Sequence, residues 1–81
     1  MTEERPPIEQ LRRGKYQKPT ASPHKGNCFR LTRVGDWIGV QDDKEYATTP
    51  VAERTTLGFT IAELEAFLIS AKAGEFDHLI A

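Results

Sequence analysis

The residues best suited to metal chemistry are His24 and Cys28, which stand four positions apart in the 81-residue chain. Imidazole nitrogen and thiolate sulfur are both common zinc ligands. A structural zinc site, however, generally takes four ligands in paired spacings, and the sequence offers no second pair to match this one. We therefore expect two ordinary side chains here, and neither a metal nor another cofactor.

The acidic run Asp42, Asp43 and Glu45 could be imagined as a general acid and base. That chemistry needs carboxyl groups in contrasting surroundings, so that their proton affinities separate. The run lies in a polar stretch, where we expect a solvated loop instead. The sequence also has no phosphate-binding loop, no glycine-rich dinucleotide turn and no nucleophile with its base in view. We therefore expect a protein that is not an enzyme.

Charge is distributed unevenly along the chain. Up to Arg33 there are eight Lys or Arg against three Glu, and beyond it there are three against nine Asp or Glu. Such a dipolar protein can bind a second protein, and a basic segment can also bind nucleic acid. The net charge of −1 and the absence of a recognition helix favour the protein partner. The alternative is direct binding of nucleic acid, with phosphate contacts from Arg12, Arg13, Lys15, Lys18 and Lys25.

Length and composition indicate one small domain. A chain of 81 residues buries a small fraction of its surface, so oligomerisation is one source of added stability. A single cysteine allows no intrachain disulfide, and nothing resembles a signal peptide. The apolar runs are far shorter than the roughly 20 residues that cross a bilayer. We expect a cytoplasmic protein that does not span a membrane.

Residues 1–14 are predicted to form an N-terminal arm with a short helix, ahead of a single domain over residues 15–81. Pro6 and Pro7 suit the first turn of a helix, and Ile8 and Leu11 fall on one face of it. So short a helix is unstable alone in water. It must therefore dock, either on the chain's own core or on a partner.

A hairpin is predicted around Gly35-Asp36, a pair that suits a two-residue loop. The resulting register pairs Val34 with Trp37, Leu31 with Val40, and Phe29 with Asp42. Because strand side chains alternate, one side is apolar and the other is mostly polar except for Val34 and Trp37. That pair either joins an interface, where aromatic residues are enriched, or is covered by the N-terminal segment. The apolar side comprises Phe29, Leu31, Ile38 and Val40.

A third strand is predicted over residues 55–59, followed at once by a helix. Thr60 and Glu63 form a capping box, and Gly74 supplies a left-handed stop. We predict an α+β domain: a small antiparallel sheet of three to four strands with one C-terminal helix packed on its apolar face, and a short N-terminal helix. The residues at helical spacing that would cover the sheet are Ile61, Leu64, Phe67, Leu68 and Ala71.

The chain continues beyond this helix with Phe76, Leu79 and Ile80. A tail with nothing to cover would not need three large apolar residues. They either complete the core or dock on a second chain, and the small size of the domain favours the second option.

Four segments between Tyr16 and Asp77, about three quarters of the chain, resemble the BldB-like family of small actinobacterial domains. Tyr16 and Leu64 stand where the family usually has Trp, and Gln41 where it has Arg. The segments that carry the likeness are Gly26-Asn27-Cys28, Val40-Gln41-Asp42-Asp43-Lys44, Leu57-Gly58-Phe59-Thr60 and Ala71-Lys72-Ala73-Gly74-Glu75-Phe76-Asp77.

The resemblance implies a non-enzymatic regulator of development and sporulation that acts on transcription through protein contacts. It implies a homodimer that engages a helix-turn-helix DNA-binding protein. A weaker alternative is an antitoxin-like inhibitor of a toxic protein. The resemblance assigns no functional residues. The interface residues predicted from the hairpin register and the apolar tail are Tyr16, Val34, Trp37, Phe76 and Leu79.

Overall fold

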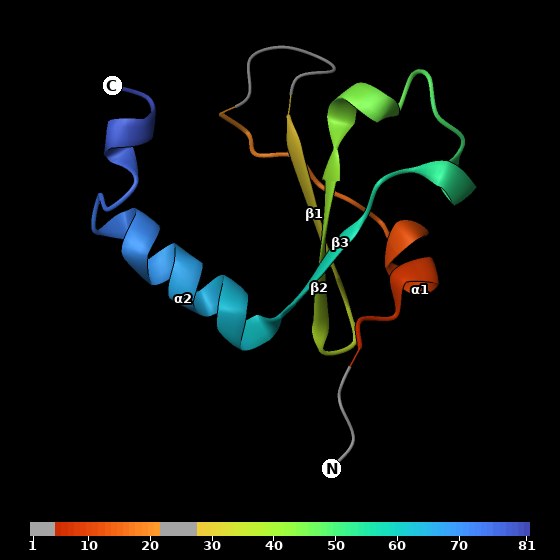
Figure 1. Cartoon of the computed structure of the whole chain (residues 1–81), viewed down its shortest axis with the longest axis horizontal. Coiled ribbons are helices and arrows are strands. Elements are labelled where there is room, and N and C mark those ends of the chain that lie inside the picture. Colours follow the sequence, from red (N-terminus) through yellow and green to blue (C-terminus); the bar gives the residue numbers. More distant parts are fainter. Residues whose placement is uncertain (1–4, 22–27) are drawn as a thin grey trace.

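The structure is a computed structural model that describes residues 5–21 and 28–81 of the chain. It contains one antiparallel sheet in the order β1-β2-β3, with strands Phe29–Val34, Trp37–Asp42 and Leu57–Thr60. Helix α1 (Ile8–Arg12) precedes the sheet and helix α2 (Ile61–Lys72) follows it (Figure 1). The predicted α+β class, with its sheet and two helices, is confirmed.

The hairpin β1-β2 has the predicted register. Val34 pairs with Trp37, and Phe29 pairs with Asp42 at the far end. Gly35 at the turn has a φ of 60°, a conformation that glycine adopts without steric cost. Gln17 adds a single antiparallel bridge to Leu31 on the outer edge of β1. The register therefore follows from the turn residues and the alternation of side chains.

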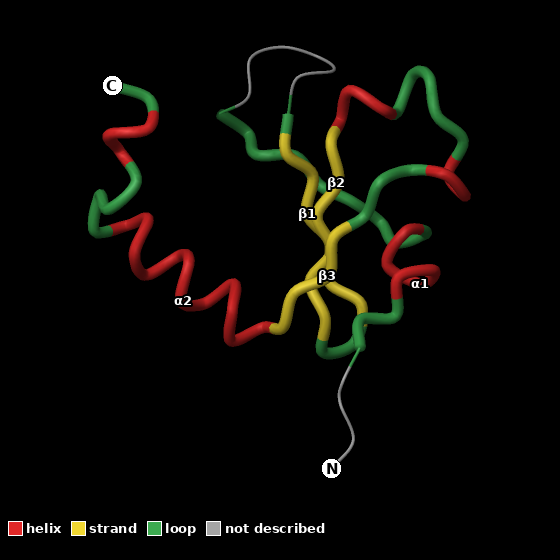
Figure 2. Tube along the Cα trace, in the orientation of Figure 1, coloured by secondary structure: helices red, strands yellow, loops and turns green. Residues whose placement is uncertain are grey.

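Strand β3 passes into α2 without a loop (Figure 2). Thr60 pairs with Trp37 as the last strand residue and is also the N-cap of α2. The predicted capping box is present: the Glu63 amide donates to Thr60 Oγ1 at 3.1 Å, and the Thr60 amide donates to Glu63 Oε1 at 2.7 Å. The capping box therefore fixes the start of α2 at the last residue of the strand.

The two helices lie on opposite sides of the sheet, α1 on the right and α2 on the left of Figure 1. Cross-strand pairing assigns each strand residue to one of two faces. We call the side toward α1 the α1 face; it includes Thr32, Val34, Trp37, Gly39, Gln41 and Gly58. We call the other side the groove face; it comprises Phe29, Leu31, Arg33, Ile38, Val40, Asp42, Leu57 and Phe59.

Helix α1 docks on the chain's own sheet, which settles the choice left open for Ile8 and Leu11. Leu11 is fully buried, and an added Cβ at Gly58 would lie 3.0 Å from its Cδ1. The hydroxyl of Tyr16 sits over Gly39 and donates to the Leu11 carbonyl at 2.9 Å. Gly39 and Gly58 are cross-strand partners, so together they form the flat floor that receives the N-terminal segment.

The apolar core is small. Among the described residues only Leu11 and Ile38 are buried apolar side chains. The expectation that α2 would bury its whole apolar stripe is wrong, because only its Ile61, Leu64 and Ala71 are half-buried while Phe67 and Leu68 are exposed. Contact with the sheet is concentrated near the junction, and the rest of α2 leads away from the strands (Figure 1). Much apolar surface therefore remains exposed on the groove face of the sheet and on α2.

Candidate functional site

An apolar groove lies between the groove face of the sheet and the chain that follows it. It has a volume of about 910 Å³, and Val40 and Leu57 lie in its floor while Ile80 reaches it from the C-terminal end. A second hollow of about 260 Å³ continues it between Val40 and Phe67 toward the junction. The apolar or small residues that line the larger part are Pro19, Ala21, Cys28, Phe29, Val40, Leu57 and Ile80.

The side chains around this groove are exposed to an unusual degree. Phe29 is 73% exposed, although the hairpin register places it on the predicted core side. Leu57 is 52% exposed beside it. Isolated apolar side chains on a surface are ordinary, but a contiguous patch of large ones marks a site of interaction.

We call residues 61–81 the C-terminal arm; it lines the groove through Ile80 and the second hollow through Leu64 and Phe67. Gly74, with a φ of 82°, ends α2: its amide donates to Ala71, and the Glu75 amide donates to Ser70. The Phe76 ring then stacks on Phe67, with centroids 5.6 Å apart. This stack places the end of the chain against the helix.

The rim of the groove carries charges that already have partners. Lys44 Nζ lies 3.2 Å from the Asp42 carboxylate. The backbone amide of Lys44, together with its side chain, lowers the pKa of Asp42 by hydrogen bonding. Glu63, at the junction end, is occupied by the capping box. An apolar floor with a paired polar rim is suited to docking another apolar surface.

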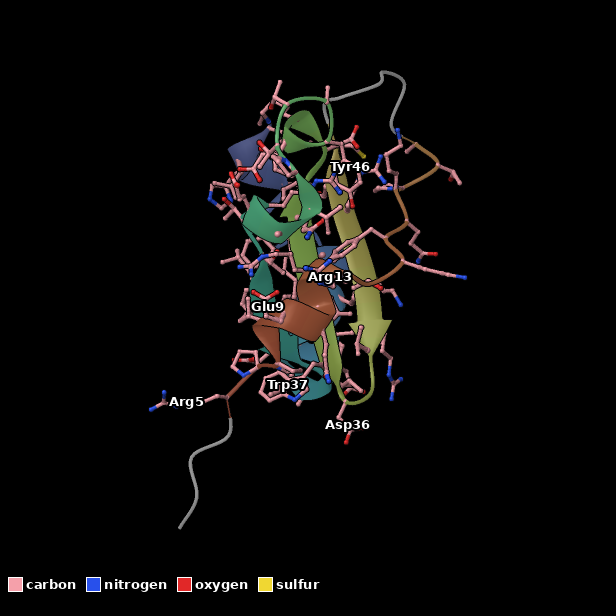
Figure 3. The ribbon with its side chains drawn as sticks, turned by 90° about the vertical axis from the view of Figure 1, so that its right-hand side faces the viewer. Arg5, Glu9, Arg13, Asp36, Trp37 and Tyr46 are labelled. Carbon is pink, nitrogen blue, oxygen red and sulfur yellow. The ribbon has the colours of Figure 1, made fainter. Side chains whose placement is uncertain are left out.

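Three of the predicted interface residues lie away from this groove. Tyr16, Val34 and Trp37 are half-buried, and they belong to the side of the sheet that carries α1. Figure 3 shows Trp37 beside the segment that leads from Arg5 into α1. Burial raises the pKa of Tyr16 to about 12, a shift to which the nearby Tyr46 adds. The N-terminal segment thus covers part of the surface that was predicted to be available.

The other two predicted interface residues, Phe76 and Leu79, lie on the C-terminal arm. Phe76 is 39% exposed and Leu79 is 70% exposed. They do not complete the core of their own chain. The structure therefore separates the five candidates into two groups on opposite sides of the sheet.

Several of the basic residues considered for nucleic-acid binding already have ion-pair or hydrogen-bond partners within the chain. Arg12 pairs with Glu9, and its Nε donates to the Arg54 carbonyl at 3.0 Å. Lys18 lies 3.7 Å from Asp43, and Arg13 lies 4.0 Å from Glu9. Lys15 is exposed, whereas Lys25 falls outside the described residues.

A polar cluster that sequence reasoning missed lies beside the groove. Asp43 is only 4% exposed and pairs with Arg30, so the expectation of a solvated loop is wrong for this residue. The guanidinium groups of Arg30 and Arg54 lie 3.7 Å and 3.9 Å from the centre of the Tyr46 ring. Two cations so close to one centroid must occupy opposite faces of the ring, which makes Tyr46 the centre of the cluster.

Gln41 connects this cluster to the α1 side. It is 3% exposed, accepts from the Tyr46 hydroxyl at 2.9 Å, and donates to Thr56 Oγ1 and to the Arg12 carbonyl. The predicted register offered one signal for the cluster, because pairing Phe29 with Asp42 brings Arg30 near Asp43. Nothing in the sequence indicated the roles of Tyr46 and Arg54.

The described part of the chain comprises residues 5–21 and 28–81. This part of the chain holds no group of three or more side chains arranged to bind a metal ion, and His24 falls outside it. None of its helices has the length and apolar character needed to cross a bilayer. No family model, curated protein or solved structure matches the chain.

Proposed function

We propose that this chain is a non-enzymatic regulator that acts by binding other proteins in the cytoplasm. In this proposal it is a homodimer, and the dimer engages a helix-turn-helix transcription factor in the control of development. The observation that carries the proposal is the exposed apolar groove, with Phe29, Leu57 and the C-terminal arm around it. Large exposed apolar patches bounded by polar groups are characteristic of protein interfaces.

The small core supports a role that depends on a partner. With Leu11 and Ile38 as the buried apolar side chains of the described chain, little apolar burial opposes the entropy of folding. Covering Phe29 and Leu57 with another protein would remove more apolar surface from water. Binding and stability are therefore coupled in this proposal.

The helix-turn-helix partner is supported by the likeness in the segments from Gly26 to Asp77. On the α1 face, Val34 and Trp37 stay half-buried and adjacent at the end of the hairpin. This pair provides a second contact surface, separate from the groove. We assign the transcription factor to the Val34/Trp37 end and a second copy to the groove.

The test is capture of the partner from an actinobacterial lysate by tagged wild-type protein beside Trp37→Ala, with identification by mass spectrometry. A helix-turn-helix protein recovered by wild type and lost with Trp37→Ala is the expected result. Asp36→Ala, an exposed change at the same hairpin end, is the matched control and should capture as wild type does. Equal recovery by wild type and Trp37→Ala would show that the assigned surface is wrong.

A gel shift with nucleic acid tests the competing function. A shift by the isolated protein that fades steeply as salt rises would replace this proposal with direct nucleic-acid binding. The Lys15→Ala variant would then weaken the shift, because Lys15 is exposed within the basic segment. We expect no shift even at low salt.

A further inference from the structure

We infer that the groove of each chain is filled by the C-terminal arm of a second copy, so that two chains exchange arms. This inference rests on the homodimer in the proposed function and gives it a specific geometry. It names the occupant of the groove and the residues that each copy contributes. Four observations lead to it: the junction at Thr60, the amount of exposed apolar surface, its arrangement, and the distribution of charge.

The junction keeps the arm from closing on its own sheet. Thr60 serves as the last residue of β3 and as the N-cap of α2, so no residue is left over as a hinge. Folding α2 flat onto the groove face would require a different backbone conformation at Thr60, which is already fixed by its pairing with Trp37 and by its place as the N-cap. The groove therefore stays open in the single chain, and its occupant has to come from elsewhere.

The exposed apolar surface is large enough for a stable dimer. Without Ile69, which lies on the other side of α2, eight large apolar side chains of the groove face and the arm are at least 37% exposed. At about 200 Å² for each whole side chain, they leave on the order of 900 Å² in water. A standard stable interface buries about 800 Å² on each partner. The eight are Phe29, Leu57, Phe59, Phe67, Leu68, Phe76, Leu79 and Ile80.

The surface is divided in a way that suits exchange. The groove face presents Phe29 and Leu57 as a floor, and the arm presents Leu68 on α2 and Leu79 on the turn that follows it. Each chain carries both a groove and an arm that can fill one. Two copies related by a two-fold axis can therefore each place an arm in the groove of the other. Such a closed, isologous arrangement leaves no groove unfilled that could recruit a further copy.

Charge favours the same occupant. The arm carries Glu63, Glu65, Glu75 and Asp77 against Lys72 alone. The groove face carries an exposed Arg33 by its pairing with Ile38, and its one acidic residue, Asp42, is paired with Lys44. An acidic arm that enters beside a basic strand gains attraction during approach and docking. A second copy supplies such an arm without any other protein.

The experiment uses complementary variants of the full chain in sedimentation equilibrium. The groove variant is Phe29→Lys with Leu57→Lys, and the arm variant is Leu68→Glu with Leu79→Glu. All four side chains are exposed in the single chain, so each variant should keep its fold, which circular dichroism checks. The matched control is Ala62→Glu with Ile69→Glu, two exposed positions on the other side of α2.

We expect wild type and the control to dimerise alike. Each of the two test variants alone should raise the dissociation constant by about a hundredfold, as loss of central contacts does. An equal mixture of the two variants should dimerise again. In the mixed dimer one contact joins an unchanged arm to an unchanged groove, and the other places Glu against Lys.

The other outcomes would overturn arm exchange in distinct ways. Dimerisation of the arm variant as wild type would indicate a sheet-to-sheet dimer, and dimerisation of the groove variant as wild type would indicate a helix-to-helix dimer. A mixture that stays monomeric, or a monomeric wild type, would also reject exchange. Capture of the transcription factor through Trp37 is measured separately, so its loss would count against the proposed function without bearing on the arms.

Discussion

At the scale of single residues, the described chain depends on a few well-connected polar side chains. Tyr46 lies between two guanidinium groups and also donates to the buried Gln41. Gln41 in turn reaches the backbone of α1 through the Arg12 carbonyl. These contacts link the loop after β2 to the N-terminal segment across the edge of the sheet.

Changing Tyr46 tests this connection. Tyr46→Phe removes the donor to Gln41 Oε1 and should lower the free energy of unfolding by about 1 kcal/mol. Tyr46→Leu also removes both cation–π contacts and should cost about 1 kcal/mol more. Urea denaturation measures both, with the exposed Thr48→Ala as a control near zero. Equal stability of the Phe and Leu variants would show that the stacked guanidinium groups contribute nothing.

The raised pKa of Tyr16 gives a pH dependence with a definite sign. Its pKa is about 12 in the folded chain and about 10 in an unfolded one. Between these values the unfolded state loses its proton first, so the free energy of unfolding should fall from about pH 10 to pH 12. Below pH 10 this contribution is fully present. Tyr16→Phe should show a shallower decline over that window, and an unchanged slope would contradict the assignment.

At the scale of elements, the placement of α1 depends on the absence of side chains beneath it. Gly39 and Gly58 lie opposite each other on β2 and β3. A Cβ at Gly58 would come within 2.4 Å of the Pro6 Cβ, and one at Gly39 within 2.4 Å of the Tyr16 hydroxyl. The N-terminal segment can approach this closely only because both positions are glycine.

Gly58→Ala should therefore loosen the N-terminal segment. We expect a loss of roughly 1–3 kcal/mol in the free energy of unfolding, as overpacking usually costs. The fluorescence of Trp37, which lies beside this segment, should shift to longer wavelength as water enters (Figure 3). Gly35→Asn keeps the turn conformation and serves as the control. A Gly58→Ala protein with native fluorescence and stability would refute the close docking.

Local sequence signals, such as turn and capping residues, predicted the strands and helices well. They predicted less of how these elements pack against one another. The turn at Gly35-Asp36 specified the hairpin register, and Thr60 with Glu63 specified the start of α2. The angle between α2 and the sheet depends on the backbone at Thr60, which no periodicity encodes. The docking of α1 depends on pairing Gly39 with Gly58, and that register was not predicted.

The candidate site was predicted only in part for the same reason. Phe76 and Leu79 were recognised as surplus apolar residues, and the structure leaves them exposed. Phe29 was assigned to the core, because alternation identifies a face but not whether anything covers it. The buried Asp43 looked like a solvated acid, since its partner Arg30 lies on the neighbouring strand.

At the scale of the whole molecule, an open arrangement replaces a closed core. The chain measures 38 by 37 by 17 Å, so it is flat, with the sheet and the C-terminal arm diverging from the junction (Figure 1). A compact chain of this length would hide Phe29, Phe67 and Leu79, which are all exposed here. In the proposed homodimer, the stability of the fold is coupled to association.

Thermal unfolding should therefore depend on protein concentration. We expect Tm to rise by several degrees for each tenfold increase in wild-type concentration, because dissociation accompanies unfolding. The variant with Phe29→Lys and Leu57→Lys should lose this dependence, whereas the variant with Ala62→Glu and Ile69→Glu should keep it. A wild-type Tm that is constant over a hundredfold range of concentration would contradict the coupling.

The missing hinge at Thr60 determines how far the arm can reach. A short Gly-Ser linker inserted before Thr60 would preserve the helix cap yet let α2 turn back over its own strands. The arm would then meet its own groove at an effective concentration in the millimolar range, far above that of any second copy in a dilute solution. The lengthened chain should be a compact monomer in small-angle scattering and sedimentation. The length of the connection before Thr60 would thus determine whether the arm binds its own groove or that of a second copy, because the apolar contacts are the same in both cases.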